Sequence, residues 1–311
     1  MRIRVFRWED LPAIADVMNA FYTGFGIPIN NPITVEQIES RWRVPYNHPD
    51  RDCFIAEDED GRIIGFVIAD LLDNPRRANG VYRVPAGNTE AGRLLMNAAH
   101  EHFRRVAARR GVSGEPLTMQ WTIIDSADEV ITLLEAEGCA LVRSFYTMSI
   151  NLPDTPLEPM PLPEGFERRP FVRDDVETVF AAYHDIFADH WGDQNTTLDE
   201  WRMDIEQPGF DPDLWWVIYA GDEIAGLLLC NTETEQAGWV SLLGVRRVWR
   251  KHGLASALLR QCFIEFQRRG RERVELGVDS DSPTNAVSLY KRAGMHVRQR
   301  ILYYDKVLPP L

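Results

Sequence analysis

The hydrophobic and polar positions in the first half of the chain recur in the same order in the second half. Near the start, RVFRWEDLPAIADVMNAF combines a short strand pattern, an acidic pair and apolar residues at helical spacing, and RPFVRDDVETVFAAYHDIF repeats all three. The acidic pairs, which suit a first helical turn, are Glu9 with Asp10 and Asp174 with Asp175. The matching apolar positions are Leu11, Ile14, Val17 and Phe21, then Val176, Val179, Ala182 and Ile186.

The parallel continues through both halves. TVEQIESRWRVP matches TLDEWRMDIEQP, which predicts N-caps at Thr34 and Thr197 and helix stops before Pro45 and Pro208. Paired strand patterns follow, with turns at Gly61 and at Gly221-Asp222. Each half then has a long helix, a strand, a short helix ending in glycine (Gly138 or Gly294) and a final strand. The order β-α-α-β-β-β-α-β-α-β in each half predicts a duplicated α/β fold, each copy being a mixed twisted sheet flanked by helices.

The two copies are separated by a proline-rich segment. NLPDTPLEPMPLPEG, residues 151–165, contains five prolines and almost no apolar periodicity, which is the composition of a linker. We therefore expect one domain over residues 1–150 and another over residues 166–311.

Composition limits the function classes. The 34 basic and 47 acidic side chains give a net charge of −13, which disfavours a nucleic-acid binder and a polybasic membrane anchor. The four cysteines (Cys53, Cys139, Cys230 and Cys262) have no metal-ligand spacing and are expected to be buried thiols in a reducing compartment. There is no secretory pattern and no apolar run of membrane-spanning length. We expect a cytoplasmic protein without a metal site, whose oligomeric state is open.

A basic cluster on this acidic chain marks the candidate site. GVRRVWRKHGLASALL passes from a strand pattern to a helix pattern that begins near Gly253. Amides at a helix N-terminus have no intrahelical partner and can bind phosphate, while Gly253 allows close approach of an anion. Arg and Lys beside the turn add charge for a diphosphate. A solvated basic helix start, packed on the sheet, is the alternative interpretation of this turn alone.

Two motifs in the second half resemble those of the GNAT superfamily of acyl-CoA-dependent N-acyltransferases. RKHGLA, residues 250–255, resembles its motif A, Q/R-x-x-G-x-G/A, and NAVSLYKRAGM, residues 285–295, resembles its motif B, N-x-x-A-x-x-L-Y-x-x-x-G-F. Asn285, Leu289, Tyr290 and Gly294 match motif B, whereas Ser288 takes the place of its Ala and Met295 that of its Phe. The resemblance covers most of the second half, and the order of elements extends it to the first.

The resemblance implies a binding mode for acetyl-CoA as co-substrate. The fourth and fifth strands of the second half would splay apart, and Leu243, Gly244 and Val245 would offer backbone contacts to the pantetheine arm and the thioester carbonyl. Asn285 would bond the arm, and the Tyr290 hydroxyl would protonate the leaving sulfur. The alternative for Tyr290 is a packed helix tyrosine. The residues that would hold the diphosphate are Arg250, Lys251, His252, Gly253, Leu254, Ala255 and Ser256.

The general base stays open at this point. The two-domain mycothiol synthases, which share the layout, carry a Glu near the start of the fourth strand, where this chain has Trp239. Ordered water is one possibility, and a side chain is the other. The candidate side chains are Asp279 at the end of the fifth strand, His190 after the first helix, and Glu233 and Glu235 in a turn, where they are more typical of surface charge.

The first half serves as an internal control. Residues 89–93 fall opposite the diphosphate turn, with Arg93 as their one basic residue and Glu90 adding a charge that repels phosphate. Glu129 falls opposite Asn285, and Leu134 falls opposite Tyr290. We expect a degenerate GNAT-like domain without the cofactor motif, which supports the fold or, through an expected loop at residues 20–32, helps to recognise the acceptor.

The expected function is acetyl transfer from acetyl-CoA to a primary amine of a small molecule, in the C-terminal domain. The alternatives are a mycothiol-synthase-like acetyltransferase and a non-catalytic acyl-CoA-binding sensor. Retention of Tyr290 disfavours the sensor, which has no need of an acid for a leaving group. The sequence does not identify the acceptor.

Overall fold

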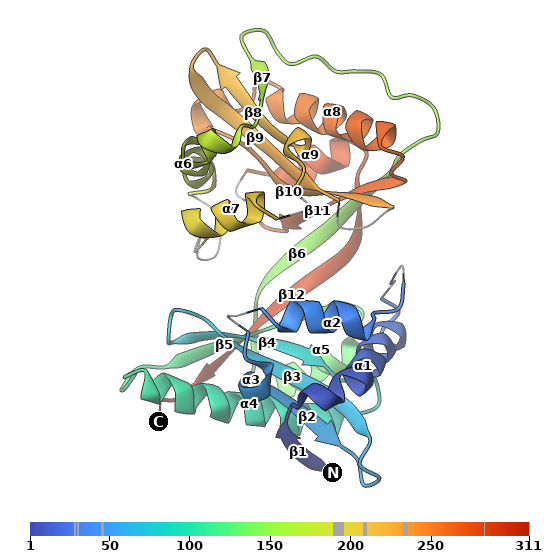
Figure 1. Cartoon of the computed structure of the whole chain (residues 1–311), viewed down its shortest axis with the longest axis vertical. Coiled ribbons are helices and arrows are strands. Elements are labelled where there is room, and N and C mark those ends of the chain that lie inside the picture. The colour runs from blue at the N-terminus through green and yellow to red at the C-terminus, as the bar shows by residue number, and fades with distance from the viewer. Residues whose placement is uncertain are drawn as a thin grey trace. The chain divides into compact units, whose positions relative to one another are not determined.

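The computed structural model forms two compact units, each of which contains six strands of a twelve-stranded sheet (Figure 1). It describes residues 1–27, 29, 31–44, 47–188, 196–207, 210–232, 236–282 and 284–310. Unit 1 consists of Met1–Ser144 with Arg300–Leu311, and unit 2 consists of Phe145–Gln299.

Unit 1 has a sheet in the order β1-β2-β3-β4-β5-β12, in which the β4–β5 pair is parallel and the other pairs are antiparallel. Helices α4 and α5 pack on one face, and α1 and α2 pack on the other. The elements are β1 (Arg2–Val5), α1 (Leu11–Gly24), α2 (Val35–Trp42), α3 (Pro49–Asp52), β2 (Cys53–Glu57), β3 (Ile63–Leu71), β4 (Arg77–Arg83), α4 (Thr89–Arg109), β5 (Leu117–Ile124), α5 (Asp128–Ala136) and the start of β6 (Ala140–Asn151).

Unit 2 has a sheet in the order β7-β8-β9-β10-β11-β6, in which only the β10–β11 pair among these described strands is parallel. Helices α8 and α9 pack on one face, and α6 and α7 pack on the other. The elements are β7 (Glu167–Pro170), α6 (Val176–Phe187), α7 (Leu198–Ile205), β8 (Trp215–Ala220), β9 (Glu223–Asn231), β10 (Ala237–Val245), α8 (Leu254–Arg268), β11 (Arg273–Asp279), α9 (Ala286–Arg292) and the start of β12 (His296–Leu308).

The element order predicted from the hydrophobic pattern is confirmed, with the short helix α3 as an addition. Thr34 and Thr197 cap α2 and α7 as expected, each within a capping box. The acidic pairs lie in single 3₁₀ turns directly before α1 and α6. The expected loop at residues 20–32 was placed too early, because Ala20 to Gly24 continue α1 with Phe21 in the core. Pro45 and Pro208 lie outside the described residues.

The expected boundaries at residues 150 and 166 do not match the compact units, because two long strands are exchanged between the halves. In β12, Ile301 to Leu308 pair with β5 of unit 1. In β6, Phe145 to Asn151 pair with β11 of unit 2. The apolar residues of these strands explain the exchange, since Leu302 and Tyr304 join the core of unit 1 and Met148 joins the core of unit 2. Each sheet is therefore completed by a strand from the other half of the sequence.

The proline-rich segment is attached to α8 and belongs to unit 2. Gln267 donates to the carbonyls of Pro153 and Thr155, and Arg260 donates to the carbonyl of Glu158 at 2.7 Å. Leu157 packs on the core of the unit. Proline lacks an amide donor, so the carbonyls of this segment are bonded by the side chains of a neighbouring helix.

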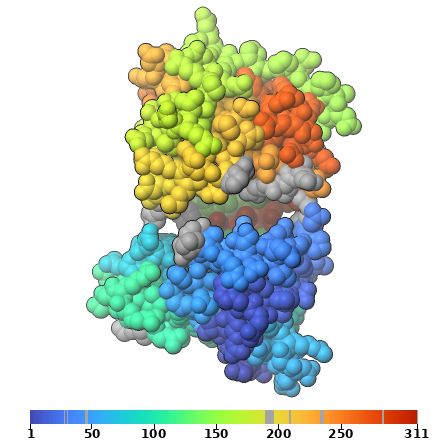
Figure 2. Space-filling view, in the orientation of Figure 1, coloured from blue at the N-terminus to red at the C-terminus, as the bar shows by residue number. Residues whose placement is uncertain are grey.

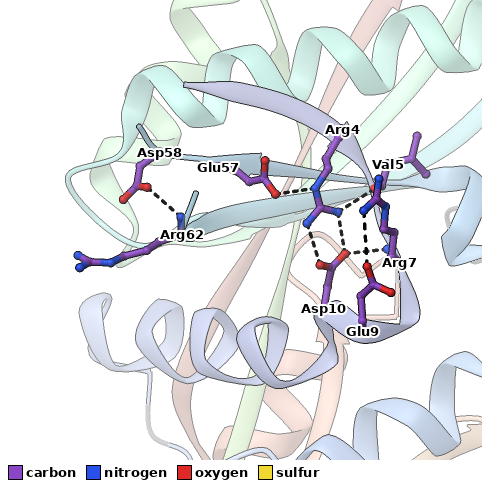
Figure 3. A network of polar contacts seen from close by, with 8 residues as sticks. All are labelled: Arg4, Val5, Arg7, Glu9, Asp10, Glu57, Asp58 and Arg62. Atoms are coloured by element: carbon purple, nitrogen blue, oxygen red, sulfur yellow. Dashed lines mark hydrogen bonds and ion pairs between the residues drawn. The ribbon is translucent and has the colours of Figure 1, made fainter. Parts of the chain in front are cut away.

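Strand β1 is anchored by a partly buried arginine (Figure 3). Arg4 donates two hydrogen bonds to Asp10, both of 2.8 Å, and one of 2.6 Å to Glu57 on β2. Burial raises the pKa of Asp10, but hydrogen bonds from Arg4 and from the Arg7 amide outweigh it and hold that pKa below its usual value.

On the face shown in Figure 2, the surface of unit 1 is mostly blue, the colour of the N-terminal part that includes α1 and α2.

Candidate functional site

Strands β10 and β11 diverge in the second unit. Ala237 to Val240 of β10 pair with Arg273 to Leu276 of β11. A β-bulge at Ser241 follows in β10, and there the pairing with β11 ends. Beyond that point β10 continues beside β9 as far as Val245, and β11 continues beside β6 as far as Asp279. The expected splay is therefore present, and it leaves the inner edge of residues 241–245 without a strand partner in the described sheet.

The turn that follows β10 has the geometry of an anion site. Lys251 (φ 68°) and Gly253 (φ 81°) are both left-handed, and α8 begins at Leu254. Among the described residues, the amides from Lys251 to Ser256 donate to no acceptor. They lie at the positive end of a 15-residue helix. Such a set of amides binds phosphate oxygens without needing a cationic side chain.

The basic side chains of this turn differ in what they contact. The Arg250 guanidinium donates to the carbonyls of Val245 at 3.0 Å and Ile186 at 3.4 Å, so it fixes the turn on β10 and α6. His252 Nδ1 lies 3.2 Å from the carbonyl of Trp249. Lys251 is exposed. The sequence predicted arginine charge for a diphosphate here, whereas the structure directs Arg250 to backbone carbonyls.

The end of β10 is tightly covered on one face. A Cβ at Gly244 would lie 2.2 Å from Cγ2 of Ile186 and 2.8 Å from the Phe187 ring, so only glycine fits against α6. Leu243 and Val245 pack toward α8. The three residues thus keep a fixed extended backbone beside the open edge of the strand.

The two motif-B residues lie at opposite ends of α9. Asn285 is the N-cap in a left-handed conformation (φ 55°), and its Oδ1 accepts from Ser288 Oγ at 2.6 Å. Tyr290 is 7% exposed and packs in the same cluster as Leu254 and Val278. Its hydroxyl makes no hydrogen bond to any described residue, and burial raises its pKa to about 12. At neutral pH this phenol is protonated and able to donate.

The structure brings one of the base candidates to the diverging strands. Asp279 ends β11, is 4% exposed and accepts from the Asp281 amide at 3.0 Å. The Trp239 ring lies over Gly277 of the neighbouring strand, 3.9 Å from where a Cβ would be. His190, Glu233 and Glu235 lie outside the described residues.

The equivalent turn in unit 1 holds a carboxylate of its own chain. Strands β4 and β5 also diverge, after Gly80 and Trp121. Between β4 and α4, however, the Gly87 amide donates to Glu129 Oε2 at 2.8 Å. Sequence comparison placed Glu129 opposite Asn285 but did not reveal this contact, because a hydrogen bond across 42 residues has no local pattern.

Two further features of unit 1 disfavour an anion near the start of α4: a tyrosine packs closely on the helix, and the charge of an arginine is neutralised. Tyr82 packs on α4 so closely that a Cβ at Gly92 would lie 2.1 Å from its hydroxyl. Arg93, the basic residue of the aligned segment, pairs with Glu90 and Glu137. An anion bound at this turn of unit 1 would be repelled by the Glu129 carboxylate, which already accepts from the Gly87 amide.

The comparisons define the class of protein. The sequence model of the acetyltransferase (GNAT) family matches residues 176–295. A GCN5-related N-acetyltransferase from Sphaerobacter thermophilus superposes with a TM-score of 0.83 and 27% identity, over 99% of this chain and 96% of that one. The chain belongs to the GNAT acetyltransferase family.

More particular similarities extend over most of the chain. A mycothiol acetyltransferase from Thermobispora bispora is 31% identical over 242 residues, 72% of this chain and 78% of that relative. One from Thermomonospora curvata is 29% identical over 239 residues, 76% of each chain. A tandem GNAT protein from the clavulanic acid biosynthesis pathway shares the fold at a TM-score of 0.70 and 14% identity, over 100% of this chain and 99% of that one. The fold is thus two GNAT-type domains in tandem. None of the described helices combines the length and apolarity that a membrane span requires.

Proposed function

We propose that unit 2 transfers the acetyl group of acetyl-CoA to a primary amine of a small molecule. The observation that carries this proposal is the set of unpaired amides from Lys251 to Ser256 next to the divergence of β10 and β11. The amides would hold the diphosphate of the donor. The free edge of β10 at Leu243 to Val245 would bond its extended arm as a further strand would, with Asn285 as a second contact.

The chemical step needs few groups. A neutral amine attacks the thioester carbonyl, the C–N bond forms, and the tetrahedral adduct collapses with cleavage of the C–S bond. Tyr290 gives its proton to the departing thiolate, and the protonated nitrogen of the adduct loses a proton to solvent, which leaves a neutral amide and returns a proton to Tyr290. A buried phenol suits this role because its pKa of about 12 keeps the proton in place until a strong base develops next to it.

Deprotonation of the amine is assigned to water or to Asp279. Asp279 lies at the end of β11, where that strand diverges from β10, but one of its oxygens already accepts from a turn amide. A base at this place would act only on an amine that enters from the face of the sheet on which Asp279 lies.

A second candidate is the reaction for which the relatives are named, mycothiol acetylation. It is supported by relatives that match about three quarters of this chain. It is disfavoured by Trp239, which stands where the family resemblance leads us to expect a Glu. A non-catalytic acyl-CoA sensor is disfavoured by Tyr290, whose ring is buried while its unbonded hydroxyl is left able to donate.

The test is CoA release measured with a thiol reagent, in which the full chain and acetyl-CoA are offered a panel of primary amines and mycothiol precursors. Release with an amine, accompanied by the mass of the acetylated product, supports the proposal. Saturable CoA binding with no product from any amine would contradict it and favour the sensor.

A further inference from the structure

Unit 1 has a basic hollow that the acetyl-transfer reaction does not use. It has a volume of about 570 Å³ and lies where α3, the C-terminal part of α4 and strand β1 meet. Its size falls within the range of small-molecule sites. The residues that line it are Val5, Asp50, Arg51, His102, Arg105 and Arg109.

One arginine of the hollow is held in place by a buried chain of polar groups. Arg51 donates to both oxygens of Asp52, at 2.8 and 2.6 Å, and Asp52 in turn lies 2.7 Å from His102 Nε2. Asp52 and His102 are 7% and 6% exposed. Such a pair fixes the plane of the Arg51 guanidinium, and the N–H groups that do not face Asp52 stay available to a ligand.

The other two arginines lack partners. Arg105 and Arg109 are one turn apart on α4, so their side chains project from the same face. Neither makes an ion pair or a side-chain hydrogen bond with any residue in the described ranges. Other arginines of the same helix behave differently, since Arg93 pairs with Glu90 and Glu137, and Arg104 pairs with Glu101. Although the chain has a net charge of −13, these two adjacent unpaired guanidinium groups make the surface locally positive, which favours binding of an anion.

We propose that this hollow binds a small phosphorylated molecule. Three guanidinium groups from two elements surround one space, and their planar N–H pairs match the oxygens of a phosphate. Asp50 contributes one opposing charge, and Asp52 is engaged with Arg51 and His102, so the hollow keeps a net positive charge. Val5 and the arginine stems offer apolar surface to the rest of the ligand.

The site is tested with inorganic phosphate as the probe. The full chain is first saturated with CoA, so that the turn before α8 is occupied, and phosphate is then titrated by calorimetry at low ionic strength. We expect one phosphate site per chain, competition by sulfate and little effect of acetate. Arg105→Ala with Arg109→Ala should weaken phosphate binding by about tenfold or more, since two charge-assisted contacts are removed. Both residues are exposed, so folding should be retained.

A matched control removes the same charge elsewhere in unit 1. Arg2→Ala with Arg62→Ala, two exposed arginines away from the hollow, should leave phosphate binding unchanged. CoA release should be the same in all three proteins. The proposal is overturned if the CoA-saturated parent takes up no phosphate, or if the two double variants weaken binding equally.

Discussion

At the scale of single residues, the proposed chemistry depends on the hydroxyl of Tyr290. The ring is buried among Leu254, Val278 and their neighbours, whereas the hydroxyl has no partner among the described residues. The hydroxyl oxygen is not one of the fully buried, unbonded side-chain atoms of the described residues, so it is open to solvent or to a ligand. We interpret the free hydroxyl as one whose partner is the sulfur of the co-substrate.

Tyr290→Phe therefore separates catalysis from binding. The ring and its packing stay, and only the proton donor is lost. General acid catalysis contributes roughly a hundredfold or more, so kcat for CoA release should fall by about that factor while the Kd for CoA stays nearly unchanged.

The control for this variant is Tyr304→Phe in unit 1, where the hydroxyl donates to Glu135 at 3.1 Å. That change should lower the free energy of unfolding by about 1 kcal/mol and leave kcat intact. A Tyr290→Phe enzyme with the parent rate would remove this residue from the mechanism.

At the scale of elements, the two strand–turn–helix segments show how one fold carries or lacks a site. Gly253 and Gly87 are both left-handed, with φ of 81° and 83°, and both face open space. The difference lies in what meets the amides, because the turn before α8 has no internal acceptor and the turn before α4 is bonded to Glu129.

The sequence was sufficient to predict most of the helices, strands and helix caps. Apolar periodicity predicted every major helix and strand, and the caps at Thr34 and Thr197 are local signals that the structure confirms. The carboxylate of Glu129 on Gly87 and the redirected guanidinium of Arg250 were not predictable, since both depend on residues far apart in the sequence. The exchange of β6 and β12 was missed for the same reason, because strand patterns do not name their partners.

The anchor of β1 makes stability depend on pH. The pKa of Asp10 is lower in the folded state than its usual value near 4, so the unfolded chain takes up a proton first as the pH falls. The stabilisation is present above that value and is lost as pH falls through the folded pKa. Urea midpoints measured between pH 7 and pH 3 should drop less steeply for Asp10→Asn than for the parent. Identical slopes would show that the Arg4–Asp10 pair does not contribute.

At the scale of the whole molecule, the exchanged strands make the two halves of the gene dependent on each other for folding. Unit 1 requires Ile301 to Leu308, which lie at the far end of the sequence, and unit 2 requires Phe145 to Asn151. A division of the chain at the proline-rich segment would remove one strand from each sheet.

A chain that ends at Gln299 tests this dependence. It loses the buried side chains of Leu302, Tyr304 and Leu308, each worth about 1.5–3 kcal/mol, from a domain whose total stability is typically 5–15 kcal/mol. We expect loss of the cooperative unfolding transition of unit 1, followed by amide hydrogen exchange in β5, the strand that pairs with β12. A chain that ends at Leu308 keeps the strand and loses the hydrogen bonds of Arg104 to the carbonyls of Pro309 and Pro310, so it should unfold nearly like the parent. Equal stability of all three chains would contradict the exchange.

The central claim is that the turn before α8, and not its counterpart before α4, binds the acyl donor. The most direct measurement is the stoichiometry of CoA binding by calorimetry for the parent, Gly253→Glu and Gly87→Glu. The two substitutions introduce the same side chain at glycines of the same conformation, so backbone strain is matched. We predict one site per chain in the parent, its loss in Gly253→Glu through a charge placed against the diphosphate, and an unchanged site in Gly87→Glu. Two sites of similar affinity in the parent, or a Gly253→Glu protein that binds CoA like the parent, would contradict the account.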